Sequence, residues 1–158
     1  MNKKDLKPAS VFYYFEEICQ VPRPSKREEK IIAYLKAFGR KHGLETKTDE
    51  VGNVLIKKPA TPGKENLKTV ILQSHIDMVC EKNSDVEHDF LIDPIDTVVD
   101  GEWLKAKGTT LGADNGIGVA TELAILAATD IEHGPLECLF TVDEETGLTG
   151  AFALKPGF

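Results

Sequence analysis

Three short polar runs lie beside apolar stretches of this chain, and each carries side chains that can bind cations or move protons. They are Ser74-His75-Ile76-Asp77, Gly112-Ala113-Asp114-Asn115-Gly116 and Asp143-Glu144-Glu145-Thr146-Gly147. Imidazole and carboxylate groups are common protein ligands of zinc-like ions, and one carboxylate can bind two ions at once. The runs therefore predict a site for two divalent cations with a spare glutamate, as a metal-dependent hydrolase requires.

The residue types suggest how the work is divided in such a site. We expect His75 to bind a cation through its imidazole, while Asp77, two residues further on, holds the other ring nitrogen. Asp114 lies in a glycine-flanked turn, where the backbone can approach an ion closely, and is the candidate to bridge two ions. Adjacent side chains of an extended segment point in different directions, so one of Glu144 and Glu145 would bind metal and the other accept protons.

Each motif also has a simpler structural explanation. A single histidine at a strand end is more often structural than a ligand, and a pair of glutamates is usually surface charge. Only the three runs together favour a metal site. The glycine-rich run 112–118 lacks the Gly-Lys-Ser/Thr ending of a phosphate-binding loop and does not match Gly-x-Gly-x-x-Gly, which argues against a nucleotide site.

Composition excludes several classes of protein. The 158 residues have the length of one domain, and no apolar stretch approaches the about 20 residues of a transmembrane helix. A net charge of -7 argues against nucleic acid as a partner. The three cysteines form no Cys-x-x-Cys pair, which argues against a disulfide framework and a thiolate zinc site. With no secretory leader visible, we expect a soluble protein of the cytoplasm that does not bind membranes.

Apolar spacing predicts the helices and strands that must position the site. Residues three and four apart are apolar in the helical segments, and Ser25 with Glu28 forms a capping-box pattern at the start of the second helix. The acidic segment between His75 and Glu102 is expected to be a solvated connection with one short strand at most. Helices are predicted over residues 9–20, 25–43, 116–128 and 149–154.

The predicted strands place the polar runs at one edge of a sheet. His75 follows a stretch that reads as a buried strand, and Glu144 follows another apolar strand. Ligands bind beyond the carboxyl ends of strands in open α/β sheets, so distant segments would deliver their side chains to one place. Strands alternating with helices imply an α/β layer architecture. The strands are predicted over residues 44–48 and 53–57, as a hairpin, and over 67–73 and 136–142.

Three longer runs resemble a known enzyme family. They are LQSHIDMVCEKN, GEWLKAKGTTLGADNGIGVA and LFTVDEETGLTGA. In this order and spacing they resemble the cytosolic Xaa-His dipeptidases, also called aminoacyl-histidine dipeptidases or peptidase D, over nearly the whole chain. Those enzymes belong to a superfamily of co-catalytic zinc exopeptidases and aminoacylases. The resemblance implies a three-layer α/β catalytic domain with a mixed, largely parallel sheet, of which residues 1–158 are the amino-terminal part.

The same resemblance implies a role for each site residue. His75 and Asp114 would bind one ion, Asp114 and Glu145 the other, Glu144 would be the general base, and Asp77 would support His75. The cofactors implied are two divalent metal ions, zinc first, with cobalt or manganese as alternatives. The implied substrates are short peptides, typically dipeptides with carboxy-terminal histidine of the β-alanyl-histidine type.

The chain departs from that family because it stops at Phe158. The resemblance implies a further Asp ligand, a lid domain and a final His ligand, and residues 1–158 have no counterpart of these. Each ion would therefore keep only two protein ligands from this chain, and two ligands per ion predict weak binding.

Two classes of function stay open at this point. In the first, this chain and the missing carboxy-terminal part of the same protein form a metallodipeptidase. In the second, the chain alone is an inert fragment or binding domain, whose strand edges favour association with missing parts or with a second copy as a homodimer. A related aminoacylase or carboxypeptidase acting on other amide substrates is a third alternative, because its metal chemistry would be the same.

Overall fold

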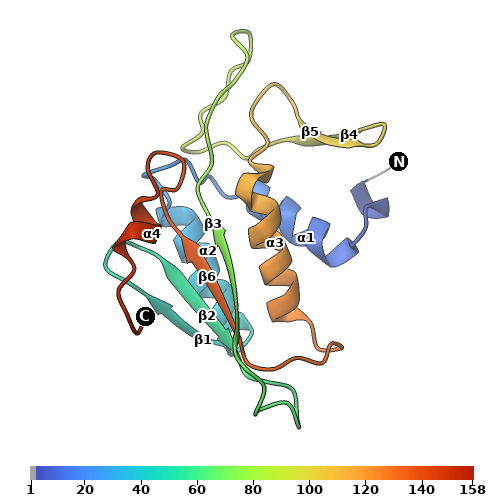
Figure 1. Cartoon of the computed structure of the whole chain (residues 1–158). Helices are drawn as coiled ribbons and strands as arrows, with labels where there is room; N and C mark the ends of the chain where they lie inside the picture. The colour runs from blue at the N-terminus through green and yellow to red at the C-terminus, as the bar shows by residue number, and fades with distance from the viewer. Residues whose placement is uncertain (1–2) are drawn as a thin grey trace.

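The computed structural model describes residues 3–158. Its main sheet has four strands, and helices pack against this sheet (Figure 1). The predicted helices and strands are confirmed, with ends that shift by at most four residues. The helical elements are a 3-10 turn η1 (Lys3–Asp5), α1 (Ala9–Cys19), α2 (Glu29–Lys41), α3 (Ala113–Ala127) and α4 (Thr149–Ala153). The strands are β1 (Glu45–Thr48), β2 (Val54–Lys58), β3 (Val70–His75), β4 (Thr97–Asp100), β5 (Trp103–Ala106) and β6 (Leu136–Thr141).

The main sheet has the strand order β1-β2-β6-β3. β1 and β2 form the predicted hairpin, with Thr48 opposite Val54, and β2 continues antiparallel to β6. β3 runs parallel to β6, with His75 opposite Thr141. The α/β class and the mixed sheet are confirmed, and within this amino-terminal portion one pairing is parallel and two are antiparallel. The turn between β1 and β2 is too short for a crossover, so these two strands must be antiparallel.

The hydrophobic core lies between one face of this sheet and the three long helices. Val54 lies opposite Phe140 and Ile56 opposite Cys138, so these four side chains point to the same face. They belong to one buried cluster with side chains of the helices, namely Phe15 and Ile18 of α1, Ile31, Leu35 and Phe38 of α2, and Val119 and Leu123 of α3. The short helix α4 contributes no side chain to this cluster.

The strand that carries His75 is an edge strand. β3 pairs only with β6, and its residues Val70 and Ile71 are 50% and 62% exposed. The expectation of a fully buried strand is therefore wrong for the first half of β3. Burial begins at Ser74 and His75, where the strand reaches the core. A run of β-branched residues does not distinguish an edge strand from a central one, since both need the same propensity.

The second helix begins later than the capping-box pattern predicts. α2 starts at Glu29, and its first turn has no side-chain cap. The Ser25 hydroxyl instead donates a hydrogen bond to Asp77 Oδ2 at 2.8 Å, while Glu28 Oε1 accepts hydrogen bonds from the backbone of Lys26 and Asp143. Both side chains of the pattern are therefore used in tertiary contacts near the polar runs.

The acidic segment after β3 is largely a solvent-exposed connection, as predicted. It includes β4, which pairs antiparallel with β5 in a two-stranded ribbon separate from the main sheet (Figure 1). Within residues 3–158 no helix combines the length and the apolarity that crossing a bilayer demands.

A buried acid in α3 leads to a prediction about stability. The Glu122 side chain is in the core at 4% exposure, and its Oε2 has no hydrogen-bond partner among the described residues. Burial raises the pKa of Glu122 to about 7. Because the folded state then holds the proton more tightly than the unfolded chain, this group's contribution to stability is full below about pH 4.5 and is lost as pH rises through 7.

We expect Glu122→Gln to remove that pH dependence. The free energy of unfolding of the variant, relative to the wild type, should rise by about 2–3 kcal/mol between pH 5 and pH 8, as measured by urea unfolding at both values. Glu102→Gln, at an exposed position, is the matched control and should follow the wild type. Parallel pH curves for wild type and Glu122→Gln would contradict this assignment.

Candidate metal centre

The three polar runs meet at one end of the sheet. β3 and β6 are parallel neighbours, so their carboxyl ends lie side by side. His75 is the last residue of β3, and Glu144 and Glu145 follow β6 in the next loop. Asp114 comes from the start of α3, which packs against β3. The structure thus brings together side chains from segments about 30 to 40 residues apart in sequence.

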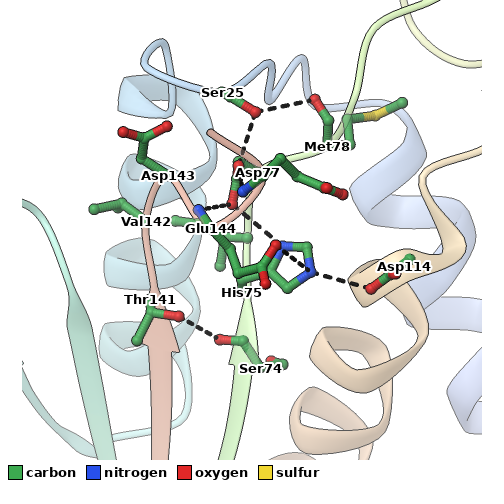
Figure 2. A network of polar contacts seen from close by, with 12 residues as sticks. Ser25, Ser74, His75, Asp77, Met78, Asp114, Thr141, Val142, Asp143 and Glu144 are labelled. Carbon is green, nitrogen blue, oxygen red and sulfur yellow. Dashed lines mark hydrogen bonds and ion pairs between the residues drawn. The ribbon is translucent and has the colours of Figure 1, made fainter. Parts of the chain in front are cut away.

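The start of α3 departs from regular helix. Gly112 has a φ of 68°, and Asp114 and Asn115 have non-helical backbone angles, so that regular helix follows from Gly116. The peptide bond between Asp114 and Asn115 is cis. This irregular turn directs the Asp114 carboxylate toward His75 (Figure 2).

The imidazole of His75 lies between two carboxylates (Figure 2). Its Nδ1 is 3.2 Å from Asp77 Oδ1, and its Nε2 is 3.1 Å from Asp114 Oδ1. Glu144 Oε2 approaches the same Nε2 to 3.9 Å. The side chain of His75 is 7% exposed, whereas that of Asp114 is 88% exposed. The ring therefore has a buried, supported side and an open side.

The donor atoms on the open side fit a divalent cation. Ligand atoms of His75, Asp114 and Glu145 all lie within 4.8 Å of one another. A zinc ion with bonds of about 2 Å to each ligand holds its donor atoms about 3 to 4 Å apart, so small side-chain rotations would suffice. One imidazole with two carboxylates is also a donor set that suits zinc-like ions. His75 and Asp114 are the ligands that the residue types predicted, and Glu145 is the ligand that the family resemblance implied.

Asp77 is fully buried and accepts four hydrogen bonds. In addition to the His75 ring, the donors are the Ser25 hydroxyl and the backbone N–H groups of Glu144 and Glu145. A single carboxylate therefore orients the imidazole and holds the loop that carries both glutamates. This position agrees with the predicted supporting role of Asp77 and extends it to a second segment.

The hydrogen bonds around His75 shift two pKa values. Burial alone would lower the pKa of His75, but the hydrogen bonds to Asp77 and Asp114 prevail and raise it to about 9. Burial would raise the pKa of Asp77, yet the His75 ring, the two backbone N–H groups and Ser25 lower it to about 2. A cation that binds at Nε2 needs the unprotonated nitrogen, so metal binding at this ring would release a proton.

A second group of carboxylates lies behind the first. Oxygens of Glu28, Asp77 and Asp143, all buried, come within 4.8 Å of one another. Their hydrogen bonds come from the protein itself: Asp143 accepts from the Thr146 and Thr149 hydroxyls, and Glu28 accepts from the Asp143 N–H. We therefore interpret this group as support for the 143–149 loop.

Sequence reasoning missed three residues near the site, all from the segment between α1 and α2. They are Arg23, Ser25 and Glu28. Arg23 donates to the Ile76 carbonyl, Ser25 donates to the Asp77 carboxylate, and Glu28 accepts a hydrogen bond from the Asp143 N–H. A sequence signal was present, because Arg23 lies between two prolines and Ser25 directly follows the second of them. The spacing of Ser25 and Glu28, however, was interpreted as a local helix cap.

A hollow of about 400 Å³ opens beside the candidate ligands. His75, Asp114 and Glu144 form its polar wall, and Leu148 and Leu154 contribute apolar surface. The hollow is large enough for a small organic molecule, and its polar wall would present His75, Asp114 and the predicted base Glu144 to that molecule. Glu145 lies outside this hollow and lines a neighbouring one together with Asp114.

Comparison with known sequences points to one family. Residues 71–156 match peptidase family M20/M25/M40. The cytosol non-specific dipeptidase of Escherichia coli is 52% identical over 150 residues, which make up 95% of this chain and 31% of the E. coli protein.

Comparison with solved structures agrees. The crystal structure of an aminoacylhistidine dipeptidase from Vibrio alginolyticus matches with a TM-score of 0.97 and 54% identity, covering 100% of this chain and 32% of that one. A tripeptidase from Staphylococcus aureus matches with a TM-score of 0.74 and 28% identity, covering 92% of this chain and 39% of that one. The chain thus spans about a third of the length of these relatives.

Proposed function

The chain belongs to peptidase family M20/M25/M40, and from this premise we propose that it contributes to a metal-dependent peptidase that hydrolyses short peptides. The observation that carries the proposal is the convergence of donor atoms of His75, Asp114 and Glu145 within 4.8 Å, with the Glu144 carboxylate beside them. No family match alone would assign these side chains a role.

The geometry supports a separate role for each side chain. His75 and Asp114 would hold one divalent ion, and Asp114 and Glu145 the other. Asp77 would keep the His75 ring in position through its bond to Nδ1. Zinc suits this donor set best, with cobalt and manganese as alternatives. When bound, the ions supply Lewis-acid polarisation of the scissile carbonyl.

Glu144 is the proposed general base. Its carboxylate is partly exposed and lies on the open side of His75, where a water molecule and a substrate can reach it. It would accept a proton from the water that attacks the carbonyl carbon, and then deliver that proton to the leaving amine as the C–N bond breaks. The backbone N–H of Glu144 donates to the buried Asp77, which keeps this segment in place.

The proposed substrates are dipeptides, with those ending in histidine first. This choice is supported by the names of two relatives above 50% identity, a non-specific dipeptidase and an aminoacylhistidine dipeptidase. The first of these is described as cytosolic, which supports the cytoplasm as the location of this protein too.

We further propose that the remaining metal ligands come from outside the residues described here. Two ions that share His75, Asp114 and Glu145 have two protein ligands each, whereas catalytic zinc ions usually have three. The chain spans about a third of its relatives, which supports residues 1–158 as one part of a larger catalytic domain.

The experiment is to measure peptide hydrolysis and metal content together. The longest polypeptide that occurs naturally with this sequence, loaded with zinc, is expected to hydrolyse β-alanyl-histidine or other dipeptides. A chelator should lower the rate of hydrolysis by at least about 100-fold. Adding back zinc, cobalt or manganese should restore it. The 158-residue chain serves as a comparison and should bind metal more weakly.

Two outcomes would contradict the proposal. One is dipeptide hydrolysis that a chelator leaves unchanged. The other is a longest natural form that binds metal, cleaves no dipeptide and cleaves an acylated amino acid, which would favour the aminoacylase alternative.

A further inference from the structure

The least expected group near the site is a buried arginine. Arg23 lies between Pro22 and Pro24, and it is only 3% exposed. Burial lowers the pKa of its guanidinium. Among residues 3–158 no carboxylate comes within ion-pair distance of it. A buried guanidinium is costly unless its N–H groups are satisfied, so its partners indicate what it does.

The partners of Arg23 are backbone carbonyls of two of the segments that form the site. Nη1 donates to the carbonyls of Ile76 and Asp77, both at 3.2 Å, and Nη2 donates to the carbonyl of Gly112 at 2.6 Å. The first two carbonyls follow His75 directly, and the third precedes Asp114 by two residues. One side chain thus joins the segment that carries His75 to the turn that carries Asp114.

The backbone around Arg23 holds the guanidinium at this junction. The Arg23 carbonyl accepts a hydrogen bond from the Met78 N–H at 3.1 Å, and Pro24 forms a parallel bridge with Met78. The arginine therefore starts from a fixed point beside the end of β3 and reaches across to the start of α3.

Two glycines leave space for the guanidinium. A Cβ atom added at Gly112 or at Gly116 would lie 2.6 Å from Arg23 Nη2, much closer than van der Waals contact. The glycine-flanked turn before α3 therefore does more than allow a close backbone approach to an ion. It lets a planar side chain pack directly under the turn.

We propose that Arg23 is a positioning residue of the metal centre, because it ties the His75 segment to the Asp114 turn and so sets the separation of their ligand atoms. The inference rests on the proposed function. The two ligand atoms are 3.1 Å apart and belong to segments with no shared secondary structure, so their spacing depends on such cross-links. The side-chain hydrogen bonds of Arg23 within residues 3–158 go to backbone carbonyls and not to the side chains of His75, Asp114 or Glu145.

The planar guanidinium of arginine is what allows one side chain to connect the His75 segment to the Asp114 turn. Its two terminal nitrogens reach carbonyls in separate segments at once, whereas the single ammonium of lysine is a point charge that cannot copy the planar arrangement. Arg23→Lys therefore keeps the positive charge but loses the link, and Arg23→Gln loses the charge while keeping one donor group.

The test measures zinc affinity of the purified protein, with zinc alone as the probe. We expect Arg23→Lys and Arg23→Gln to weaken zinc binding by about 10–100-fold, as substitutions that support metal ligands usually do. Arg27→Met, at an exposed position of the same loop, is the control and should bind like the wild type. Leu35→Ala, a substitution in the core, is a second control. It lowers the stability of the fold but leaves the hydrogen bonds of Arg23 in place, so it shows how much zinc affinity is lost through stability alone.

A second measurement does not depend on metal. In metal-free protein, amide hydrogen exchange should accelerate in Arg23→Lys at Met78, whose N–H bonds to Arg23, and at Gly116, whose N–H bonds to the Gly112 carbonyl. Amides of β2 should keep their protection.

The two measurements separate the possible failures. Absence of zinc binding in the wild type would refute the proposed function, and the exchange data would still decide the role of Arg23. Wild-type zinc affinity in a folded Arg23→Lys variant, equal weakening in Leu35→Ala, or unchanged exchange at Met78 and Gly116 would overturn the role of Arg23.

Discussion

Replacement of Glu144 by glutamine is expected to lower kcat for dipeptide hydrolysis by about 10²–10⁴-fold while leaving zinc affinity within a fewfold of wild type. The amide cannot accept the proton of the attacking water. Glu144 Oε2 is 3.9 Å from His75 Nε2, but the group of atoms that fits a cation consists of His75, Asp114 and Glu145. Steady-state kinetics with metal analysis on the same samples would measure both effects.

Glu145→Gln is the matched comparison for this prediction, since it makes the same chemical change one residue away. That variant should lose metal first and activity as a consequence, and excess zinc should restore part of its activity. If instead Glu144→Gln loses metal and Glu145→Gln retains it, the two glutamates have exchanged roles. Glu102→Gln, at an exposed position outside the three polar runs, should leave both kcat and zinc affinity unchanged.

The second large effect is expected at Asp114. As the shared ligand it would contribute to both ions, so Asp114→Ala should weaken zinc binding by more than about 100-fold and abolish hydrolysis. The side chain is 88% exposed and its hydrogen bond is to His75 Nε2, so the substitution should lower the free energy of unfolding of the metal-free protein by no more than about 1 kcal/mol. Isothermal titration with zinc and urea unfolding would test the two statements separately.

Asp130→Ala provides the control, because this aspartate is exposed in the loop after the carboxyl end of α3, whereas Asp114 lies at the amino end of the same helix. If Asp114→Ala reduced the affinity for one ion and left the second unaffected, the bridging role would be wrong and Asp114 would be a ligand of a single ion.

The elements that carry the site could be predicted because their patterns are local. Apolar spacing identified α1, β6 and the regular part of α3, and the polar runs at their ends were visible without coordinates. A parallel pair of strands must present its carboxyl ends at the same edge, so the meeting of His75 with Glu144 and Glu145 followed from topology.

Other features could not be predicted because they depend on contacts between distant segments. The spacing of Ser25 and Glu28 suits a helix cap and equally suits a tertiary role, and only the fold places Asp77 and the Asp143 N–H within their reach. The same holds for Arg23, whose partners are carbonyls that no sequence pattern marks.

The sequence by itself therefore determined the types of the candidate ligands, their order along the chain and the edge of the sheet at which they meet. The tertiary structure alone decided that β3 is exposed along its first half, that α1, α2 and α3 share one face of the sheet, and that Asp77 and Arg23 connect the segments of the site. The physical reason is the distance along the chain over which each effect acts. Periodicity and turn chemistry act over a few residues, whereas burial and hydrogen bonding of a single side chain depend on what the rest of the chain brings to it.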